Sequence, residues 1–128
     1  MLSKRRLISL LLAAFCGLSV SVVGATGAQA ASPGAETCWS YNVSCLFEHN
    51  DWQGSYTMLH QNTPDLGGWN DHTSSVINDS WYVNCYYEHA NYNGWRLVRP
   101  RGTWWTSMGD YNDQITSVRF SGRWDDSC

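Results

Sequence analysis

The second half of the sequence repeats the first, and this internal repeat is the strongest constraint on the fold. Residues 45–54 (CLFEHNDWQG) align without gaps on residues 85–94 (CYYEHANYNG), at a shift of 40. Residues 68–76 align on residues 110–118 at a shift of 42, because the intervening loop is two residues longer in the second copy. A repeat of this length is typical of one supersecondary unit used more than once. We therefore expect one structural unit, present in two copies.

Alternating residue types predict strands in each copy. Val43, Cys45 and Phe47 alternate with polar or smaller residues, which is the period of two that half-buried strands show. Clusters of Asn, Asp and Gly then mark tight turns, where glycine tolerates a positive φ. No helix signal competes, so four short strands per copy with a long return connection predict a Greek-key unit. The expected strands cover about 43–47, 55–59 and 75–77, and 81–87, 95–98 and 117–120, with long loops at 61–69 and 100–111.

Two such units can close over one another as antiparallel sheets that share a core, so the expected fold is an all-β sandwich of two Greek-key motifs. Eight Trp, seven Tyr and three Phe supply that core, since aromatic side chains bury large areas. Some aromatics will also lie at the surface, and Trp104 and Trp105, in the longer second loop, are the first candidates. Motif 1 is expected at about 45–80 and motif 2 at about 81–123.

The N-terminal residues predict an export signal. A basic start (KRR, residues 4–6) precedes an apolar run over residues 7–23, and the small-residue sequence AQA at 28–30 supplies a cleavage site. No second apolar stretch long enough to span a bilayer follows. We therefore expect a secreted, extracellular protein with no membrane span. The predicted boundaries are 1–30 for the signal peptide, 31–44 for an N-terminal lead-in segment and 45–128 for the domain.

Charge and length narrow the classes of partner. Removing residues 1–30 from the 128 leaves 98 residues, which suits one domain with one core and a monomeric protein. The mature chain keeps five Arg, no Lys and all eleven acids, so its formal charge moves from −3 to −6. Nucleic acid is excluded as a partner, because phosphate binding needs a basic stripe. An acidic surface suits cations or basic partners better.

Four cysteines remain in the mature chain, and an exported protein meets an oxidising environment. Two disulfides are therefore expected, and three pairings are possible. We favour Cys38 with Cys45, which closes a local loop, and Cys85 with Cys128, which ties down the C-terminus. A zinc site is the rival interpretation, but the chain has no C-x-x-C pair.

Two motifs resemble those of a known superfamily. An aromatic residue, six further residues and a glycine, as in Phe47 to Gly54 and Tyr87 to Gly94, resemble the folded-hairpin signature of βγ-crystallins. The segments NDHTSS (70–75) and NDQITS (112–117) fit that superfamily's calcium pattern, at equivalent places in the repeat. Together with the export signal, these motifs look most like the small secreted bacterial peptidase inhibitors that act on thermolysin-like metalloproteases.

The resemblance implies two calcium sites, and oxygen donors of this kind suit a hard cation. The bare alternative is an ordinary turn followed by a strand, with no metal. Asn and Ser at the loop ends would shape the loops through local hydrogen bonds. The implied ligands are the carboxylates of Asp71 and Asp113, the hydroxyls of Ser74 and Thr116, and the carbonyls of His72, Gln114, Glu48 and Glu88; the loop-shaping residues are Asn70, Ser75, Asn112 and Ser117.

Catalysis finds little support in the sequence. The chain has no Gly-x-Ser-x-Gly elbow, and its mature cysteines are explained by disulfides. His49 and His89 occupy equivalent repeat positions, where a structural role at the hairpin explains both. We therefore expect a non-catalytic inhibitor of an extracellular metalloprotease, acting through the loops at 61–69 or 100–108. The alternative is a cell-wall, glycan or toxin-like binding module in which Trp104 and Trp105 form stacking platforms.

Overall fold

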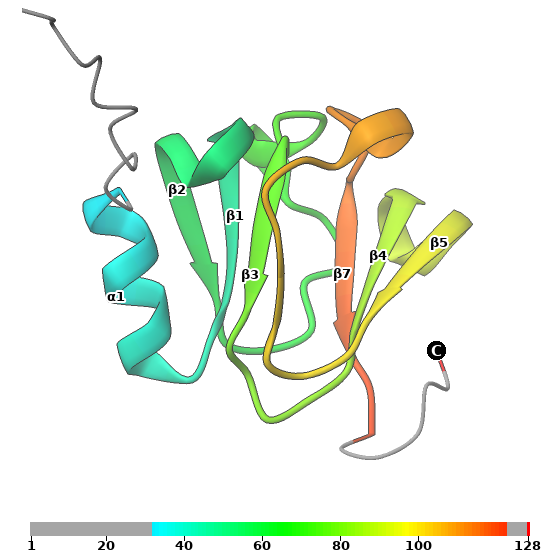
Figure 1. The fold of residues 1–128 in the computed structure, drawn as a ribbon. Coiled ribbons are helices and arrows are strands. Elements are labelled where there is room, and N and C mark those ends of the chain that lie inside the picture. Colours follow the sequence, from blue (N-terminus) through cyan, green and yellow to red (C-terminus); the bar gives the residue numbers. More distant parts are fainter. Residues whose placement is uncertain (1–31, 123–127) are drawn as a thin grey trace, which may run out of the picture.

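Two antiparallel sheets pack face to face, and a short helix covers the outer side of one of them (Figure 1). The computed structural model describes residues 32–122 and Cys128; the predicted signal peptide lies outside the described residues. The all-β prediction is confirmed, with one helical addition. The elements are α1 (Pro33–Tyr41), β1 (Ser44–His49), β2 (Gln53–Leu59), β3 (Ser75–Asn78), β4 (Asn84–His89), β5 (Asn93–Arg99), β6 (Thr103–Trp105) and β7 (Ser117–Phe120), with single 3-10 turns at Asn50–Trp52, Gly67–Trp69, Ala90–Tyr92 and Gly109–Tyr111.

Each repeat copy contributes backbone to the sheet that is formed mainly by the other copy. Sheet A has the strand order β2-β1-β3-β6, and sheet B has the order β5-β4-β7. Strand β6 belongs to the second copy, yet it pairs antiparallel with β3 of the first. In return, Thr63 of the first copy forms an isolated bridge with Val118 of β7, with N···O distances of 2.8 and 2.9 Å. Each copy therefore completes the sheet of the other.

This exchange corrects two expectations. The segment 100–111, predicted as a loop, contains strand β6, and the first copy contributes three described strands and the Thr63 bridge where we expected four strands. The predicted strand start at Trp81 is also wrong, because β4 begins at Asn84. Val83 lies just before β4, and its backbone N–H and carbonyl bond to Gly122 and Ser121 after β7.

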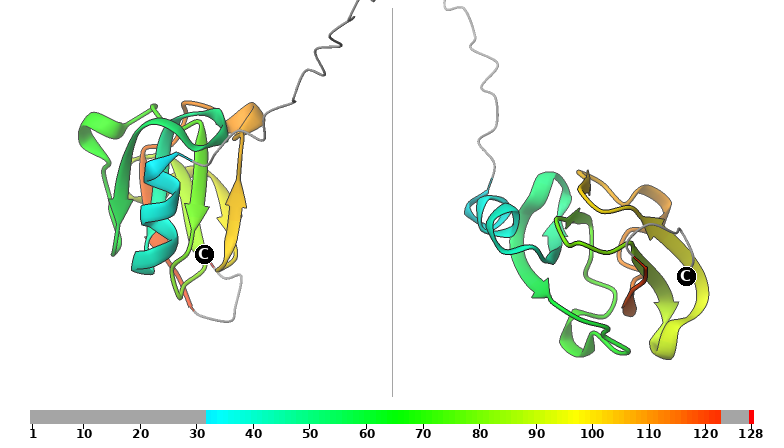
Figure 2. Two further views of the ribbon diagram at one scale, coloured as in Figure 1. Left: turned by 60° about the vertical axis from the view of Figure 1, so that its left-hand side comes forward. Right: turned by 90° about the horizontal axis from the view of Figure 1, so that it is seen from below.

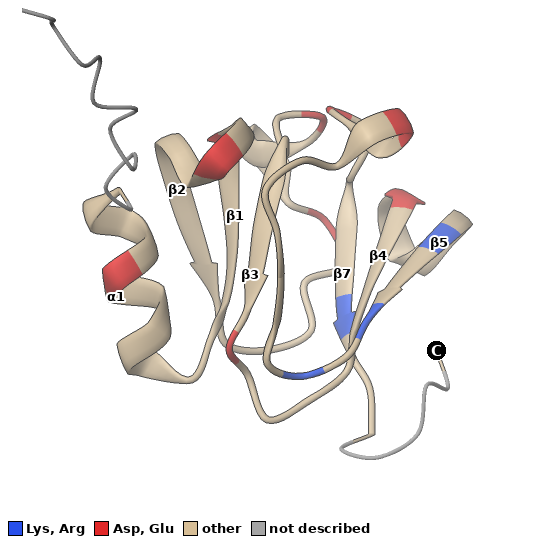
Figure 3. Cartoon of the chain, viewed as in Figure 1, with Lys and Arg blue, Asp and Glu red and all other residues tan. Residues whose placement is uncertain are grey.

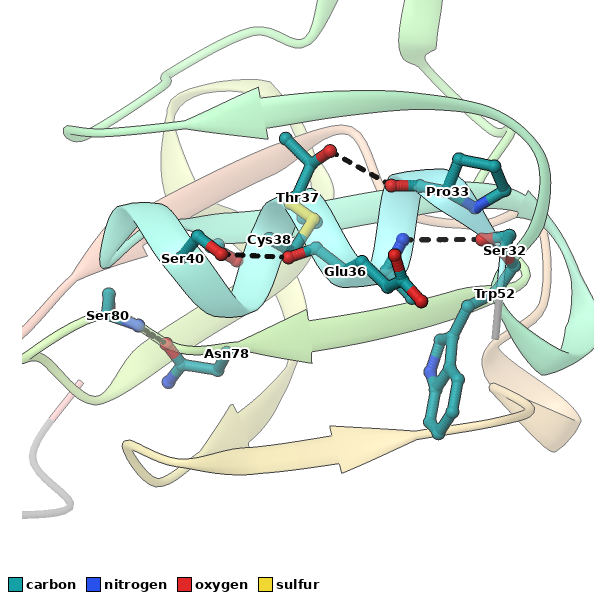
Figure 4. The surroundings of a disulfide bond; sticks show 12 residues. Ser32, Pro33, Glu36, Thr37, Cys38, Ser40, Trp52, Asn78 and Ser80 are labelled. Carbon is teal, nitrogen blue, oxygen red and sulfur yellow. Dashed lines mark hydrogen bonds between the residues drawn. A yellow bond between two sulfur atoms is a disulfide. The ribbon is translucent and has the colours of Figure 1, made fainter. Parts of the chain in front are cut away.

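The predicted lead-in segment forms helix α1. Ser32 caps its first turn by accepting a hydrogen bond from the Ala35 N–H (3.3 Å), and Pro33 sits where its missing donor costs nothing (Figure 4). The helix ends at Asn42, whose φ of 56° lies in the left-handed region that terminates helices. The Ser32 hydroxyl also donates to the Trp52 carbonyl, which fixes the helix to the turn after β1.

Helix α1 lies on the outer face of sheet A, on the side away from sheet B (Figure 2). Its buried residues Ala35 and Cys38 pack against Val43, Phe47 and Ile77, which gives the sandwich a second apolar layer. The main core lies between the sheets and draws on both copies. Its buried members are Leu46, Leu59, Val76, Tyr86, Leu97, Met108, Ile115 and Val118.

Both favoured disulfide pairings are confirmed. Cys38 of α1 bonds to Cys45 of β1, with a Cα–Cα distance of 6.2 Å, and thereby ties the helix to sheet A. Cys85 of β4 bonds to Cys128, with a Cα–Cα distance of 6.0 Å. The first three of these sulfur-bearing residues are fully buried, so each bridge is part of the packed interior.

Candidate functional site

The two Asn-Asp loops of the repeat meet at one end of the sandwich, where β1 and β4 finish. The Asp71 N–H donates to the Ile115 carbonyl (3.1 Å), and the Asp113 N–H donates to the Thr73 carbonyl (3.0 Å). Asp71 and Asp113 both adopt positive φ, 58° and 53°, a conformation that Asp tolerates better than most residues. The reciprocal bonds hold each Asp against the loop of the other copy.

One cluster of oxygens, which we call site 1, combines both copies. The Ser74 hydroxyl lies 2.7 Å from the backbone oxygen of Glu48 and 3.3 Å from Oδ1 of Asp113. Ser74 is positioned by its own N–H, which donates to the Phe47 carbonyl at 2.8 Å. A carbonyl, a hydroxyl and a carboxylate therefore converge, with the carboxylate supplied by the second copy.

The equivalent cluster, site 2, has the opposite assignment of copies. The Thr116 hydroxyl of the second copy lies 3.5 Å from Oδ1 of Asp71 of the first. A hollow of about 250 Å³ opens here, and its lining includes Glu88, His89 and Gln114 in addition to these two residues, together with Asp113 of site 1. Seven of the eight predicted ligand residues thus gather as two sets, and each set pairs the hydroxyl of one loop with the Asp of the other. The eighth, His72, lines a separate hollow beside Glu48.

The donor chemistry of both sites fits calcium. Calcium takes six to eight oxygens and accepts carboxylates, hydroxyls, carbonyls and water together. Across residues 32–122 and Cys128, no group of three or more His, Cys, Asp and Glu side chains is placed to hold a metal ion. A metal in site 1 or site 2 would therefore depend on at most two such side chains, supplemented by neutral oxygens, which suits a hard cation better than zinc.

The residues expected to shape the loops all make hydrogen bonds, but the two Ser bonds join segments 26 and 28 residues apart and the two Asn bonds go to neighbouring side chains. The Ser75 hydroxyl donates to the His49 carbonyl (2.6 Å), and the Ser117 hydroxyl donates to the His89 carbonyl (2.6 Å). Each hydroxyl also accepts a backbone N–H, from Trp52 and Tyr92 respectively, both at 3.1 Å. Asn70 donates to Oδ1 of Asp65 (3.0 Å), and Asn112 donates to Oδ2 of Asp113 (2.7 Å).

Acidic residues gather at this end of the molecule, and most arginine positions lie toward the other end (Figure 3). Hydrogen bonds from Ser55 lower the pKa of Glu48, and those from the Gly67 N–H and Asn70 lower the pKa of Asp65. Both carboxylates are therefore held in their charged form. The resulting negative field attracts cations.

Trp104 and Trp105 lie on strand β6, and only one of them matches the expected surface role. Trp104 is 56% exposed, and it lines a hollow together with Trp105, Thr106 and Ser107. Trp105 points the other way and packs against the main core, because successive residues of a strand face opposite sides. The Arg99 guanidinium lies over its ring, 2.8 Å from the ring centroid, and burial lowers the pKa of Arg99 to about 10. The expectation of an exposed pair is therefore corrected for Trp105.

A third hollow, beside the Glu48 carboxylate, was not predicted. Ser55, Gly68, Trp69 and His72 complete its lining, and its volume is about 310 Å³. The signal for it lies in a difference between the repeat copies. Ser55 aligns on the much larger Trp95, so the first copy lacks a ring that the second copy has.

Comparison with solved structures identifies the fold. A βγ-crystallin from Ciona intestinalis aligns with a TM-score of 0.58 and 23% identity, over 62% of this chain and 99% of that one. A βγ-crystallin from an archaeon aligns with a TM-score of 0.56 and 23% identity, over 61% and 95%. A βγ-crystallin domain from Clostridium beijerinckii gives 0.53 and 24%, over 62% and 97%. At these identities the likeness concerns the fold, and it confirms the predicted double Greek key.

Comparison with protein-family models adds a functional class. The model described as peptidase inhibitor family I36 matches residues 31–98, which is more than half of the chain and includes α1 and the hairpins of both copies. No curated protein matches the sequence. None of the described helices is long and apolar enough to cross a membrane.

Proposed function

The chain belongs to peptidase inhibitor family I36, and from this premise we propose that it is a secreted, monomeric, calcium-binding inhibitor of an extracellular metallopeptidase. The family match is the observation that carries the proposal. Two disulfides support an extracellular location, since such bonds persist in oxidising compartments. The acidic end of the molecule supports the calcium component.

Inhibition by this fold would depend on rigid loops. An inhibitor loop that is already ordered binds a protease cleft without the entropic cost that a flexible substrate pays. The loop at 61–69 is held by the Leu66 N–H, which donates to the Thr116 carbonyl (2.8 Å). The segment at 100–108 is held by β6 and by Met108, whose side chain is buried and whose N–H donates to the Ser74 carbonyl (2.8 Å).

Exposed Trp104 is the favoured anchor on the second segment, because exposed aromatics dominate many protein interfaces. The test is inhibition of a thermolysin-type protease, measured as an inhibition constant. We expect Trp104→Ala to raise that constant about tenfold or more, and Trp81→Ala, a change at another exposed Trp, in the turn before β4, to leave it unchanged. Full activity of the protease at saturating concentrations of the wild-type protein would refute inhibition of this enzyme class.

Calcium would be held by sites 1 and 2, and each ion would link the two copies because its ligands come from both. A ligand that binds only the folded state raises stability by about 2.7 kcal/mol at a hundred times its dissociation constant. Melting temperature should therefore rise with free calcium and fall on addition of a chelator. An unchanged melting temperature, with no heat of binding in calorimetry, would refute the calcium component.

The pairing of ligands across the copies makes a sharper test. Ser74→Ala and Asp113→Asn should remove the same calcium-binding event, because both residues belong to site 1. Asp71→Asn should remove the other event, although Asp71 is nearer to Ser74 in the sequence. The double variant Ser74→Ala with Asp113→Asn should then bind as many calcium ions as either single variant. The double variant Ser74→Ala with Asp71→Asn should bind none.

A second candidate function is glycan or cell-wall binding, which the exposed Trp104 ring beside the hydroxyls of Thr106 and Ser107 favours. Aromatic rings of this kind stack on sugar rings. Retention of the protein on insoluble polysaccharide, without inhibition of the protease, would select this alternative. Loss of that retention in Trp104→Ala would locate the platform.

A further inference from the structure

The hollow beside Glu48 is a specific asymmetry between two otherwise equivalent copies. In the second copy the corresponding space holds the rings of Trp95 and Tyr111, whose centroids lie 4.7 Å apart and which pack against the main core. The aligned residues in the first copy are Ser55 and Trp69. The first copy therefore keeps one aromatic wall and replaces the other with a small polar residue, which leaves about 310 Å³ open.

The Glu48 side chain is fixed at the rim of this hollow. The Ser55 N–H donates to Oε2 of Glu48 at 3.3 Å, so one carboxylate oxygen is anchored to the backbone. The second copy keeps the same contact, from the Trp95 N–H to Oε2 of Glu88 at 3.4 Å, but there the neighbouring space is filled. The first copy thus combines an ionised carboxylate with an accessible, half-buried indole.

A carboxylate beside an aromatic face is the chemistry that recognises a guanidinium. The planar group can donate two parallel N–H bonds to a carboxylate and stack on an aromatic ring, and a cation over Trp gains about 0.5–2 kcal/mol. The surrounding end of the sandwich is acidic (Figure 3), and no Lys or Arg among the described residues lines the hollow, in which His72 is the other ionisable side chain beside Glu48. Charge complementarity therefore favours a cationic group from outside the chain.

We propose that this hollow receives an arginine side chain of a partner protein, which pairs with Glu48 and stacks on Trp69. The proposal does not depend on protease inhibition or on calcium, because it uses the carboxylate of Glu48, whereas site 1 uses the Glu48 backbone oxygen. It gives the predicted preference of this acidic protein for basic partners a location and a chemical specificity.

The probe is N-acetylarginine amide, titrated into the full protein at pH 7.5 and followed by the indole N–H signal of Trp69 in NMR spectra. Trp69→Phe identifies that signal. The neutral isostere N-acetylcitrulline amide is the matched ligand control. We expect saturable binding of the arginine compound and at least tenfold weaker binding of the citrulline compound, both with saturating calcium and with a chelator.

Two variants locate the binding. Ser55→Trp copies the filled arrangement of the second copy and should abolish the Trp69 shift. Glu48→Gln keeps an acceptor for the Ser55 N–H, removes the charge and should raise the dissociation constant about tenfold. Glu36→Gln, on the exposed side of α1, makes the same change in net charge and should leave binding unchanged.

The proposal is overturned if citrulline binds as tightly as arginine, if Glu36→Gln weakens binding as much as Glu48→Gln, or if Trp69 shows no saturable shift. Retention of binding in a folded Ser55→Trp protein would overturn it as well. Should Ser55→Trp fail to fold, the comparison of Glu48→Gln with Glu36→Gln decides the matter alone.

Discussion

At the scale of single residues, Thr73 is a polar residue at a position where the second repeat copy has an apolar residue, Ile115. Its side chain is fully buried, and its hydroxyl finds no hydrogen-bond partner among the described residues, whereas the aligned Ile115 is a core residue. Burying an unpaired hydroxyl costs about 1–3 kcal/mol. We expect Thr73→Val to raise the free energy of unfolding by about 1 kcal/mol, measured by urea denaturation.

The matched control for Thr73 lies two residues away. Ser75 is equally buried, but its hydroxyl donates to the His49 carbonyl and accepts from the Trp52 N–H. Ser75→Ala should therefore lower stability by about 1–3 kcal/mol, because it leaves both backbone groups unpaired. Equal responses of the two positions would show that hydrogen bonding does not distinguish them.

Asp65 should make stability depend on pH in the acid range. The Gly67 N–H (2.8 Å) and the Asn70 amide (3.0 Å) bond its carboxylate, and these bonds lower its pKa below the ordinary 3.8. The charged form is favoured in the folded state, so the stabilisation is present above the unfolded pKa and is lost as pH falls through the folded value. The stability gap between wild type and Asp65→Asn should shrink from pH 6 to pH 2. A gap that is constant with pH contradicts this assignment.

Individual positions differ in how far the sequence could predict them. Cysteine spacing and compartment favoured the pairing that forms, because one bridge is local and the other ties down a terminus. The facing of Trp105 could not be predicted, since it depends on β6, a strand of three residues. The hollow beside Glu48 could not be predicted from a motif, because it arises from Ser55, a residue that belongs to none.

At the scale of elements, neither α1 nor β6 was predicted from the sequence. Both are too short for a repeating pattern of apolar residues to show. Helix α1 has nine residues and buries three of them, Gly34, Ala35 and Cys38, so no apolar stripe repeats. Its stability comes from a cap, a disulfide and a sheet face supplied by other elements. Strand β6 pairs with a strand of the other copy, which a pattern read along one segment does not reveal. The first strand of each hairpin departs from the alternation expected of a half-buried strand. Residues 44–47 and 84–87 are all buried, because a second apolar cluster lies on the outer face of each strand.

The cap of α1 gives a prediction at this scale. Ser32 accepts the Ala35 N–H and donates to the Trp52 carbonyl, so Ser32→Ala removes a helix cap and a tertiary contact together. We expect a loss of about 1–2 kcal/mol in global stability and faster hydrogen exchange at the Ala35 amide. Far-UV circular dichroism during urea unfolding and NMR-detected exchange measure the two effects.

Ser40 on the same helix serves as the control. Its exposed hydroxyl bonds back to the Glu36 carbonyl at 3.1 Å, an interaction within the helix that adds little to stability. Ser40→Ala should therefore change global stability by less than about 0.5 kcal/mol, as surface substitutions usually do. If Ser32→Ala changes global stability as little as Ser40→Ala does, the helix is held by its disulfide and its packing, and the cap is dispensable.

At the scale of the whole molecule, the repeat predicted two units but not how far they depend on each other. Sheet A contains a strand of copy 2, and sheet B is extended by Thr63 of copy 1. Further backbone bonds cross between the copies in equivalent pairs: the Asp51 N–H donates to the Thr106 carbonyl (2.7 Å), and the Asn91 N–H donates to the Pro64 carbonyl (2.8 Å). Neither copy has a closed sheet, a complete core or a complete oxygen site of its own.

This interdependence predicts that the two copies unfold together. With both disulfides intact, urea unfolding should be a single transition in which tryptophan fluorescence and far-UV circular dichroism coincide. Ile77→Ala in sheet A and Val118→Ala in sheet B each remove buried volume and should cost about 2–4 kcal/mol. Because the main core draws on both copies and β3 pairs with β6 of the second copy, each variant should shift the midpoint of both probes equally. Two transitions, with Ile77→Ala moving one and Val118→Ala moving the other, would mean that each copy folds alone and that the strand exchange contributes little to stability.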